Sequence, residues 1–193
     1  MKTKQIMLKG NWECGWALDL NTVCEGSEEN DLLLVRRTEI GENLYQLKYF
    51  GNKEKVRVIG NVASNFIMKK IKPLGAKAII PVPPSKLDRK FQPVYELSKF
   101  IGKKTGIPVD FDYLIKTRET PQLLNIEKGE ERRKILKDIF KIKDRRYEGE
   151  NLLLFDDLYS SGETLKSITE VLISEGKTSD IYVLTIAKTR VQK

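Results

Sequence analysis

Hydrophobic residues along the chain switch between short continuous runs and helical spacing. The runs at 76–81, 151–155 and 181–186 are mostly apolar, which is typical of strands that are buried on both faces. Between them, apolar residues recur at helical spacing over 90–105 and 162–175. Because strands alternate with helices in this order, the pattern predicts a mainly parallel sheet with helices on both faces.

The first third of the chain predicts a smaller unit of its own. Its apolar runs are shorter, and Pro73 and Gly75 interrupt the pattern before the first buried run. We therefore expect an N-terminal extension of strands and two helices over 1–73, followed by a core over 74–193. The elements predicted in the extension are strands at 16–20 and 32–35 and helices at 38–50 and 53–71.

The segment from Leu152 to Leu165 carries most of the recognisable chemistry. A buried strand ends in two adjacent carboxylates, Asp156 and Asp157, and a short turn then leads into a helix. The start of a helix offers unpaired backbone N–H groups and the positive end of the helix dipole, which together bind anions. Gly162 lets the backbone approach a ligand closely. Hydroxyl donors in the same segment are Ser160, Ser161 and Thr164.

The two acids suit a sugar and a metal ion. Carboxylates accept hydrogen bonds from a vicinal diol, and they bind Mg²⁺ directly or through water. Helix capping would explain one acid at this place. It does not explain two neighbouring acids after an apolar strand, because their mutual repulsion requires a cation or hydrogen-bond donors. An anion-binding turn beside such a pair fits a ribose 5-phosphate.

The composition of the chain excludes several classes of catalytic and metal-binding site. The chain has no histidine, which removes the usual general base and most zinc or haem sites. Cys14 and Cys24 cannot supply a four-ligand zinc site, and we expect them to be ordinary buried thiols. Lys and Arg number 35 against 27 Asp and Glu, a formal net charge of +8. That balance favours an anionic partner without choosing between nucleic acid, phosphorylated metabolites and anionic lipid.

The chain shows no sign of a membrane partner. No uninterrupted apolar run reaches the length of a membrane span, and the first ten residues are too short and too interrupted for a secretory signal. We therefore expect a cytoplasmic protein.

Several segments resemble a known family. Leu152–Thr164 resembles the phosphoribosyl pyrophosphate (PRPP) signature of type I phosphoribosyltransferases. The ComF-like branch, named for a competence protein in DNA uptake, is similar over a longer stretch, about 76–190, although its members often begin with a four-cysteine zinc element. The other matching segments are Ile80–Lys86, Phe91–Ser98 and Lys116–Gln122, together with Arg37–Gly41 and Leu47–Tyr49.

The resemblance implies a fold and an activity. The fold would be type I phosphoribosyltransferase-like α/β, a mainly parallel sheet flanked by helices with a small N-terminal α+β hood. The activity would be the Mg²⁺-dependent transfer of a 5-phosphoribosyl group from PRPP to an unidentified, base-like acceptor with loss of diphosphate. The alternative is a non-catalytic accessory protein that binds PRPP or a nucleotide and acts in DNA uptake, repair or regulation.

The resemblance also assigns roles to residues. Asp156 and Asp157 would hold the ribose hydroxyls and Mg²⁺, and Arg118, in a mobile catalytic loop, would close over the ligand. The residues implied for the diphosphate are Pro84, Ser85 and Lys86. The residues implied for the 5-phosphate are Tyr159, Ser160, Ser161, Gly162, Glu163 and Thr164.

Glu163 departs from the family pattern, which has a small neutral residue at that place. A carboxylate there would oppose a phosphate. Because an acid in the first turn of a helix is favourable, we expect its side chain to point to solvent.

Nucleic acid is a weaker alternative partner. Aromatic residues that lie among basic ones can stack on single-stranded nucleic acid, but we favour packing for them. These aromatic residues are Trp12, Trp16, Tyr45, Tyr49 and Phe50. A homodimer also stays open.

Overall fold

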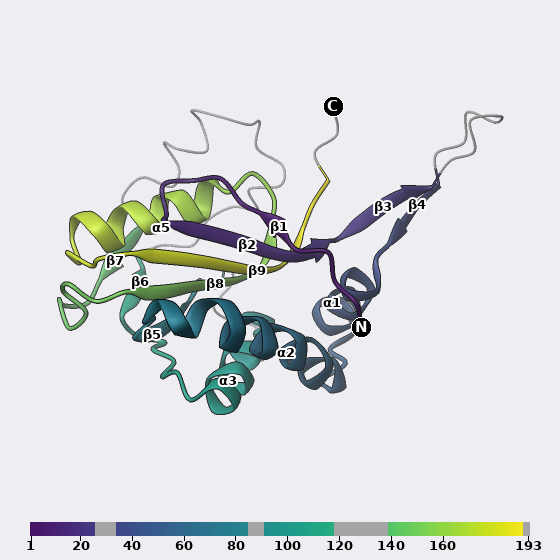
Figure 1. Cartoon of the computed structure of the whole chain (residues 1–193), viewed down its shortest axis with the longest axis horizontal. Coiled ribbons are helices and arrows are strands. Elements are labelled where there is room, and N and C mark those ends of the chain that lie inside the picture. The colour runs from purple at the N-terminus through teal and green to yellow at the C-terminus, as the bar shows by residue number, and fades with distance from the viewer. Residues whose placement is uncertain (26–33, 85–90, 118–138, 191–193) are drawn as a thin grey trace.

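A computed structural model describes four stretches of the chain, 1–25, 34–84, 91–117 and 139–190. Its centre is a five-stranded sheet in the order β1-β2-β9-β8-β5 (Figure 1). The strands are β1 (Ile6–Met7), β2 (Cys14–Leu20), β5 (Ala78–Pro81), β8 (Leu152–Tyr159) and β9 (Ile181–Lys188). Strands β2, β9, β8 and β5 are parallel, and the short edge strand β1 is antiparallel to β2. The predicted class, a mainly parallel sheet flanked by helices, is confirmed.

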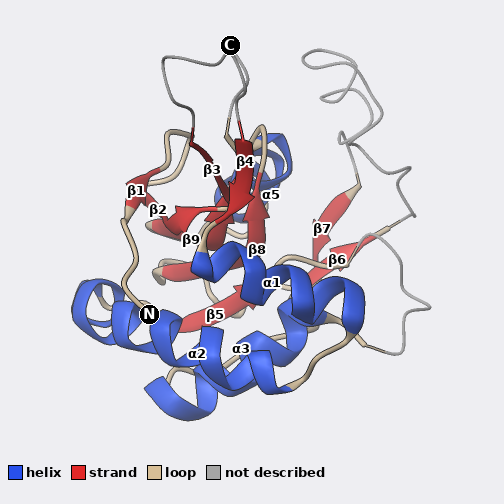
Figure 2. Ribbon diagram, turned by 90° about the vertical axis from the view of Figure 1, so that its right-hand side faces the viewer, coloured by secondary structure: helices blue, strands red, loops and turns tan. Residues whose placement is uncertain are grey.

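Helices cover both faces of the sheet. Figure 2 shows α1 (Glu39–Phe50), α2 (Glu54–Phe66) and α3 (Pro93–Thr105) together on one side, and α5 (Glu163–Ser174) covers the other. Helix α2 continues through a π-helical turn, Ile67–Ile71, and a 3₁₀ turn, Lys72–Leu74. Two hairpins complete the described fold, β3 (Thr22–Glu25) with β4 (Leu34–Arg37) and β6 (Leu114–Lys116) with β7 (Phe140–Ile142).

The central strand β8 divides the core between the two faces. Successive side chains of a strand point to opposite sides. Leu152 and Leu154 accordingly pack in the cluster under α5, while Leu153 and Phe155 pack in the cluster under α1, α2 and α3. All four are fully buried, and burial of each such side chain contributes about 1.5–3 kcal/mol.

Local signals place helix α1 as predicted. The Thr38 hydroxyl accepts a hydrogen bond from Gly41 N at 3.0 Å and caps the first turn, and Gly51 ends the helix with φ of 63°. The apolar residues at 111–115 also predict a strand, but β6 begins only at Leu114. The basic segment at about 129–139, for which the sequence predicts a helix, lies almost wholly outside the described residues.

The N-terminal segment shares the core of the sheet. Strand β2 lies between β1 and β9, and Ile40, Leu44 and Ile59 from α1 and α2 are buried in the same cluster as residues of β8 and β9. The boundary near residue 73 stays a prediction. Only β3 and β4 leave the body as a projecting hairpin (Figure 1).

The aromatic and thiol side chains of this segment differ from expectation in part. Trp12 is buried, and Trp16 packs edge-on against Phe66 with ring centroids 5.6 Å apart. Tyr49 and Phe50 are 69% and 66% exposed, and their rings pack against the Tyr45 ring with centroids 4.9 and 5.6 Å apart. The free thiols Cys14 and Cys24 are half-buried, on β2 and β3, where we expected buried ones.

None of the helices in the described stretches has the length and apolar character that crossing a membrane requires.

Candidate functional site

The acid pair lies where the sheet narrows. Strand β5 pairs with β8 only as far as Pro81 opposite Phe155, and Val82 N then donates to Phe155 O at 2.9 Å. Beyond that point the pairing of β8 that continues among the described strands is with β9, as far as Tyr159. Asp156 and Asp157 therefore lie near the carboxyl end of a central strand, and β8 continues beyond them to Tyr159. In open α/β sheets this end is where ligands bind.

Asp157 is paired with a lysine that the sequence did not single out. Lys48 Nζ lies 3.0 Å from Oδ1 and 2.9 Å from Oδ2 of Asp157, whose side chain is 11% exposed. Burial alone would lower the pKa of the Lys48 ammonium, but the charge and hydrogen bond of Asp157, with Asp156 behind them, raise it above its ordinary value. The cation that two neighbouring acids require is thus provided by the last turn of α1.

Two features of the sequence weakly indicate that Lys48 is part of the site. It follows Leu47, a buried position of an amphipathic helix, and it lies in the Leu47–Tyr49 segment that resembles the ComF-like branch. Neither signal names its partner, because Lys48 and Asp157 are 109 residues apart.

Asp156 is in a different environment from its neighbour. Strand alternation directs it to the opposite side of β8, where it is half-buried and its Oδ1 accepts the Asp157 N–H at 2.8 Å. Burial, with the charge of Asp157 added, raises the pKa of Asp156 to about 7, although the backbone hydrogen bond and Lys48 oppose this. Near neutral pH this acid is therefore close to half protonated.

The turn after β8 depends on a glycine. Gly162 has φ of 80° and serves as the N-cap of α5, with no side-chain hydrogen bond to cap the helix. A Cβ at this position would lie 2.6 Å from Tyr159 Oη, so the turn excludes a side chain for both conformational and steric reasons. A helix start built in this way suits an anion.

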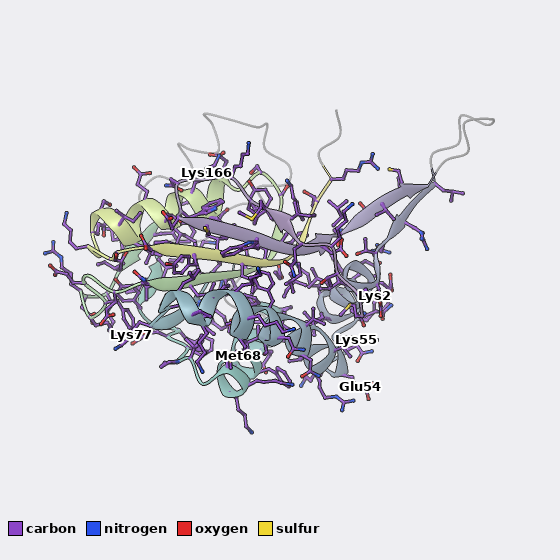
Figure 3. All side chains as sticks on the ribbon, viewed as in Figure 1. Lys2, Glu54, Lys55, Met68, Lys77 and Lys166 are labelled. Atoms are coloured by element: carbon purple, nitrogen blue, oxygen red, sulfur yellow. The ribbon has the colours of Figure 1, made fainter. Side chains whose placement is uncertain are left out.

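Positive charge flanks the turn. Lys188 Nζ lies 5.5 Å from the centroid of the buried Tyr159 ring, and Lys166 projects from the start of α5 (Figure 3). Glu163 does not point to solvent as expected: its side chain is 14% exposed, and Oε1 lies 3.0 Å from Lys166 Nζ. Lys166 thereby compensates the charge that would oppose a phosphate. Burial raises the pKa of Tyr159, which keeps its hydroxyl protonated as a donor at neutral pH.

Two further predicted segments meet beside β5. Lys116 Nζ, at the end of β6, lies 3.5 Å from the carbonyl oxygen of Pro84. The structure thus brings the start of the 116–122 segment next to the proline-rich segment after β5. Ser85, Lys86 and Arg118 lie outside the described residues.

The acid pair does not form a metal site by itself. Within the described stretches, no group of three or more acidic or cysteine side chains could hold a metal ion. Asp157 already binds Lys48 through both oxygens, which leaves Asp156 as the better oxygen ligand. Mg²⁺ prefers about six oxygens and keeps several waters, so these residues fit the ion only when ligand phosphates also contribute.

Comparison with known proteins extends this description. No family model matches the chain. The competence protein ComFC of Bacillus subtilis (strain 168) is 26% identical over 192 residues, which cover 91% of this chain and 76% of that protein.

Solved structures give lower similarity. The adenine phosphoribosyltransferase of Leishmania tarentolae has a TM-score of 0.49 at 10% identity, covering 96% of this chain and 94% of its own. An allosteric regulatory enzyme of purine biosynthesis has a TM-score of 0.47 at 16% identity, covering 89% of this chain, which in turn spans only 37% of that enzyme. The relationship that these comparisons establish for the chain is therefore similarity, over nine-tenths of its length, to a ComFC competence protein.

Proposed function

We propose that the chain binds PRPP with Mg²⁺ and transfers the 5-phosphoribosyl group to a base-like acceptor, releasing diphosphate. The observation that carries the proposal is the succession at the end of β8: two acids beside the point where β5 ends, a glycine-dependent turn and the start of α5. The sequence resemblance to type I phosphoribosyltransferases and the similarity to ComFC support the same function.

The turn would bind the 5-phosphate. Backbone N–H groups at the start of α5 face an anion favourably, and the Tyr159 hydroxyl beside Gly162 is a further donor. Ser160, Ser161 and Thr164 add hydroxyl groups. Glu163 would take part through its backbone, because its carboxylate is held by Lys166.

The acid pair would bind the ribose ring. A carboxylate accepts hydrogen bonds from neighbouring hydroxyls, and the 2- and 3-hydroxyls of ribose form such a diol. Asp156 would hold Mg²⁺ together with ligand oxygens, and the ion would supply positive charge to the leaving group. Holding the ring and the 5-phosphate at two fixed points orients C1 toward the acceptor.

The leaving group would be held near Pro84. The bond from C1 to the diphosphate oxygen breaks, its electron pair leaves with the diphosphate, and a nitrogen of the acceptor bonds to C1 while its proton passes to solvent. Ser85, Lys86 and Arg118 would stabilise the departing charge. Such a reaction needs no covalent intermediate on the protein.

An accessory role is the second candidate. The curated relative ComFC is named as a competence protein, and a protein of that kind could bind PRPP or a nucleotide without turnover. This alternative keeps the same site and removes the acceptor reaction.

One experiment separates these functions. Purified protein is supplied with PRPP, Mg²⁺ and a panel of nucleobases, and diphosphate release is measured together with PRPP binding by calorimetry. Diphosphate release with any acceptor supports the enzyme, and binding without release supports the accessory role. Absence of PRPP binding would overturn both. Glu54→Gln, on the exposed start of α2, is the control for Asp156→Asn (Figure 3).

A further inference from the structure

The Lys48–Asp157 pair is a fixed part of the fold. Both carboxylate oxygens of Asp157 lie within hydrogen-bond distance of Nζ, at 3.0 and 2.9 Å. The side chains are 24% and 11% exposed, so the pair is largely shielded from solvent. A lysine with a mobile, exposed side chain would neither contact both oxygens nor be shielded from solvent.

Helix α1 cannot easily move Lys48 away from the sheet. At its start, Thr38 Oγ1 donates to Leu20 O at 2.6 Å and Thr38 N donates to Asn21 O at 3.1 Å. A Cβ on Gly41 would lie 2.1 Å from Asn21 O, which shows how closely the helix approaches the end of β2. Its middle is held by the buried Leu44. The last turn therefore presents Lys48 to Asp157 from a helix that is held at its start and along its buried face.

Asp156 lacks any such partner in the described part of the chain. The hydrogen bond that it accepts comes from the backbone N–H of Asp157, and no described side chain donates to it. The residue is half-buried, so part of it remains accessible. Both carboxylate oxygens of Asp157 are paired with Lys48, whereas Asp156 has no side-chain donor among the described residues. Asp156 is therefore the acid that is available to a ligand.

We infer that the two acids of the pair have different roles. Asp156 is the acid that receives the sugar hydroxyls, and Lys48 is a positioning residue that holds Asp157. Asp157 in turn fixes Asp156 through its backbone N–H. This inference rests on the proposed function, because the ligand is taken to be a phosphorylated ribose. It predicts that the Asp157 charge can be removed without loss of the site, provided that the Lys48 charge is removed with it.

A double-mutant cycle tests these different roles. PRPP affinity with Mg²⁺ is measured by calorimetry, and stability by chemical denaturation, for the wild type and its variants, among them Asp157→Leu alone, which completes the cycle with Lys48→Met and the combined variant. Asp156→Asn should not lower the midpoint, and it should lose about tenfold or more in affinity, since a charge-assisted contact is removed. Lys48→Met should lower the midpoint and weaken binding, because an unpaired carboxylate is left buried beside an anionic ligand.

The combined variant gives the decisive result. Lys48→Met with Asp157→Leu should regain the midpoint and bind PRPP within about threefold of the wild type, since an apolar pair replaces the ion pair. If Leu is not accommodated, Lys48→Met with Asp157→Asn serves the same purpose. Lys48→Arg should keep the affinity, because a guanidinium also pairs with a carboxylate. Lys103→Met is the matched control, being an exposed lysine in the last turn of α3.

The outcomes separate the inference from the function. A folded combined variant that loses as much affinity as Asp156→Asn would overturn the assignment of different roles to the two acids. The proposed function would still stand. A wild-type protein that does not bind PRPP would overturn the proposed function and, with it, the sugar-binding part of the inference. The stability cycle would still decide whether Lys48 and Asp157 form an anchoring pair.

Discussion

Gly162 and Tyr159 are in direct contact across the turn that follows β8. A Cβ at Gly162 would lie 2.6 Å from Tyr159 Oη and 2.8 Å from the ring carbon that bears it. The same glycine has φ of 80°. The backbone conformation and the closeness of Tyr159 therefore each restrict position 162 to glycine. The Tyr159 ring also sets the shape of the proposed phosphate site.

We expect Gly162→Ala to be costly for both stability and binding. A side chain at positive φ costs about 1–3 kcal/mol, and the clash with Tyr159 adds a packing cost of about 1–3 kcal/mol. The displaced turn should also weaken the binding of ribose 5-phosphate by about tenfold or more. Chemical denaturation and calorimetry measure the two effects.

Gly51 provides the control for this substitution. It has φ of 63°, and nothing lies within 4 Å of a Cβ built there. Gly51→Ala should therefore show the conformational cost alone, about 1–2 kcal/mol, with unchanged ligand affinity. Equal losses of stability in the two variants would contradict the contact between Gly162 and Tyr159.

The pKa of Asp156 predicts how stability depends on pH. The folded chain keeps this proton up to about pH 7, whereas the unfolded carboxyl loses it near its ordinary value of 3.8. Between these values the folded state binds more protons, so the free energy of unfolding falls as the pH rises. The contribution of Asp156 is at most about 1.4 kcal/mol per pH unit.

Asp156→Asn should remove that part of the slope. Urea denaturation of both proteins between about pH 4.5 and about pH 7 measures the difference. Asp112 does not interfere, because its hydrogen bond with Lys143 holds its pKa at about 2. Lys48 titrates far above the window. Parallel stability curves for the variant and the wild type would show that Asp156 is an ordinary acid.

The sequence predicted those parts of the fold that local pattern determines. Leu152–Phe155 is apolar at every position, so a strand covered on both faces could be expected, and Thr38 and Gly51 marked the ends of α1. The pattern places the strand at 16–20 in the N-terminal extension, because nothing in its residues shows that β2 pairs with β9. That pairing depends on contacts between segments far apart in the chain.

The same limit applies to the candidate site. The acids, the glycine and the hydroxyl groups lie within one short segment, 156–164, so their chemistry could be recognised there. Lys48 could not be assigned in this way, because its role follows from the packing of α1 against β9 and β2, which brings its last turn to Asp157. The position of the acids within the strand also follows from tertiary structure, since pairing with β9 carries β8 on to Tyr159.

Glu163 leads to a prediction of opposite sign from the others, because its removal should strengthen binding. Its carboxylate occupies Lys166 at 3.0 Å, beside the turn that would hold the phosphate. Glu163→Gln removes a negative charge and releases the ammonium, so affinity for ribose 5-phosphate should rise about two- to fivefold. Stability should change little, since a pair spaced i,i+3 on a helix contributes about 0.2–0.5 kcal/mol.

Glu170→Gln is the matched control, because Glu170 is an exposed acid on the same helix. Calorimetry with ribose 5-phosphate at low ionic strength gives the comparison, and added salt should reduce the gain. An unchanged affinity for Glu163→Gln would mean that Lys166 does not reach the phosphate. A lower affinity would mean that the carboxylate positions the turn, and that the unusual acid in this signature stabilises the site instead of opposing its ligand.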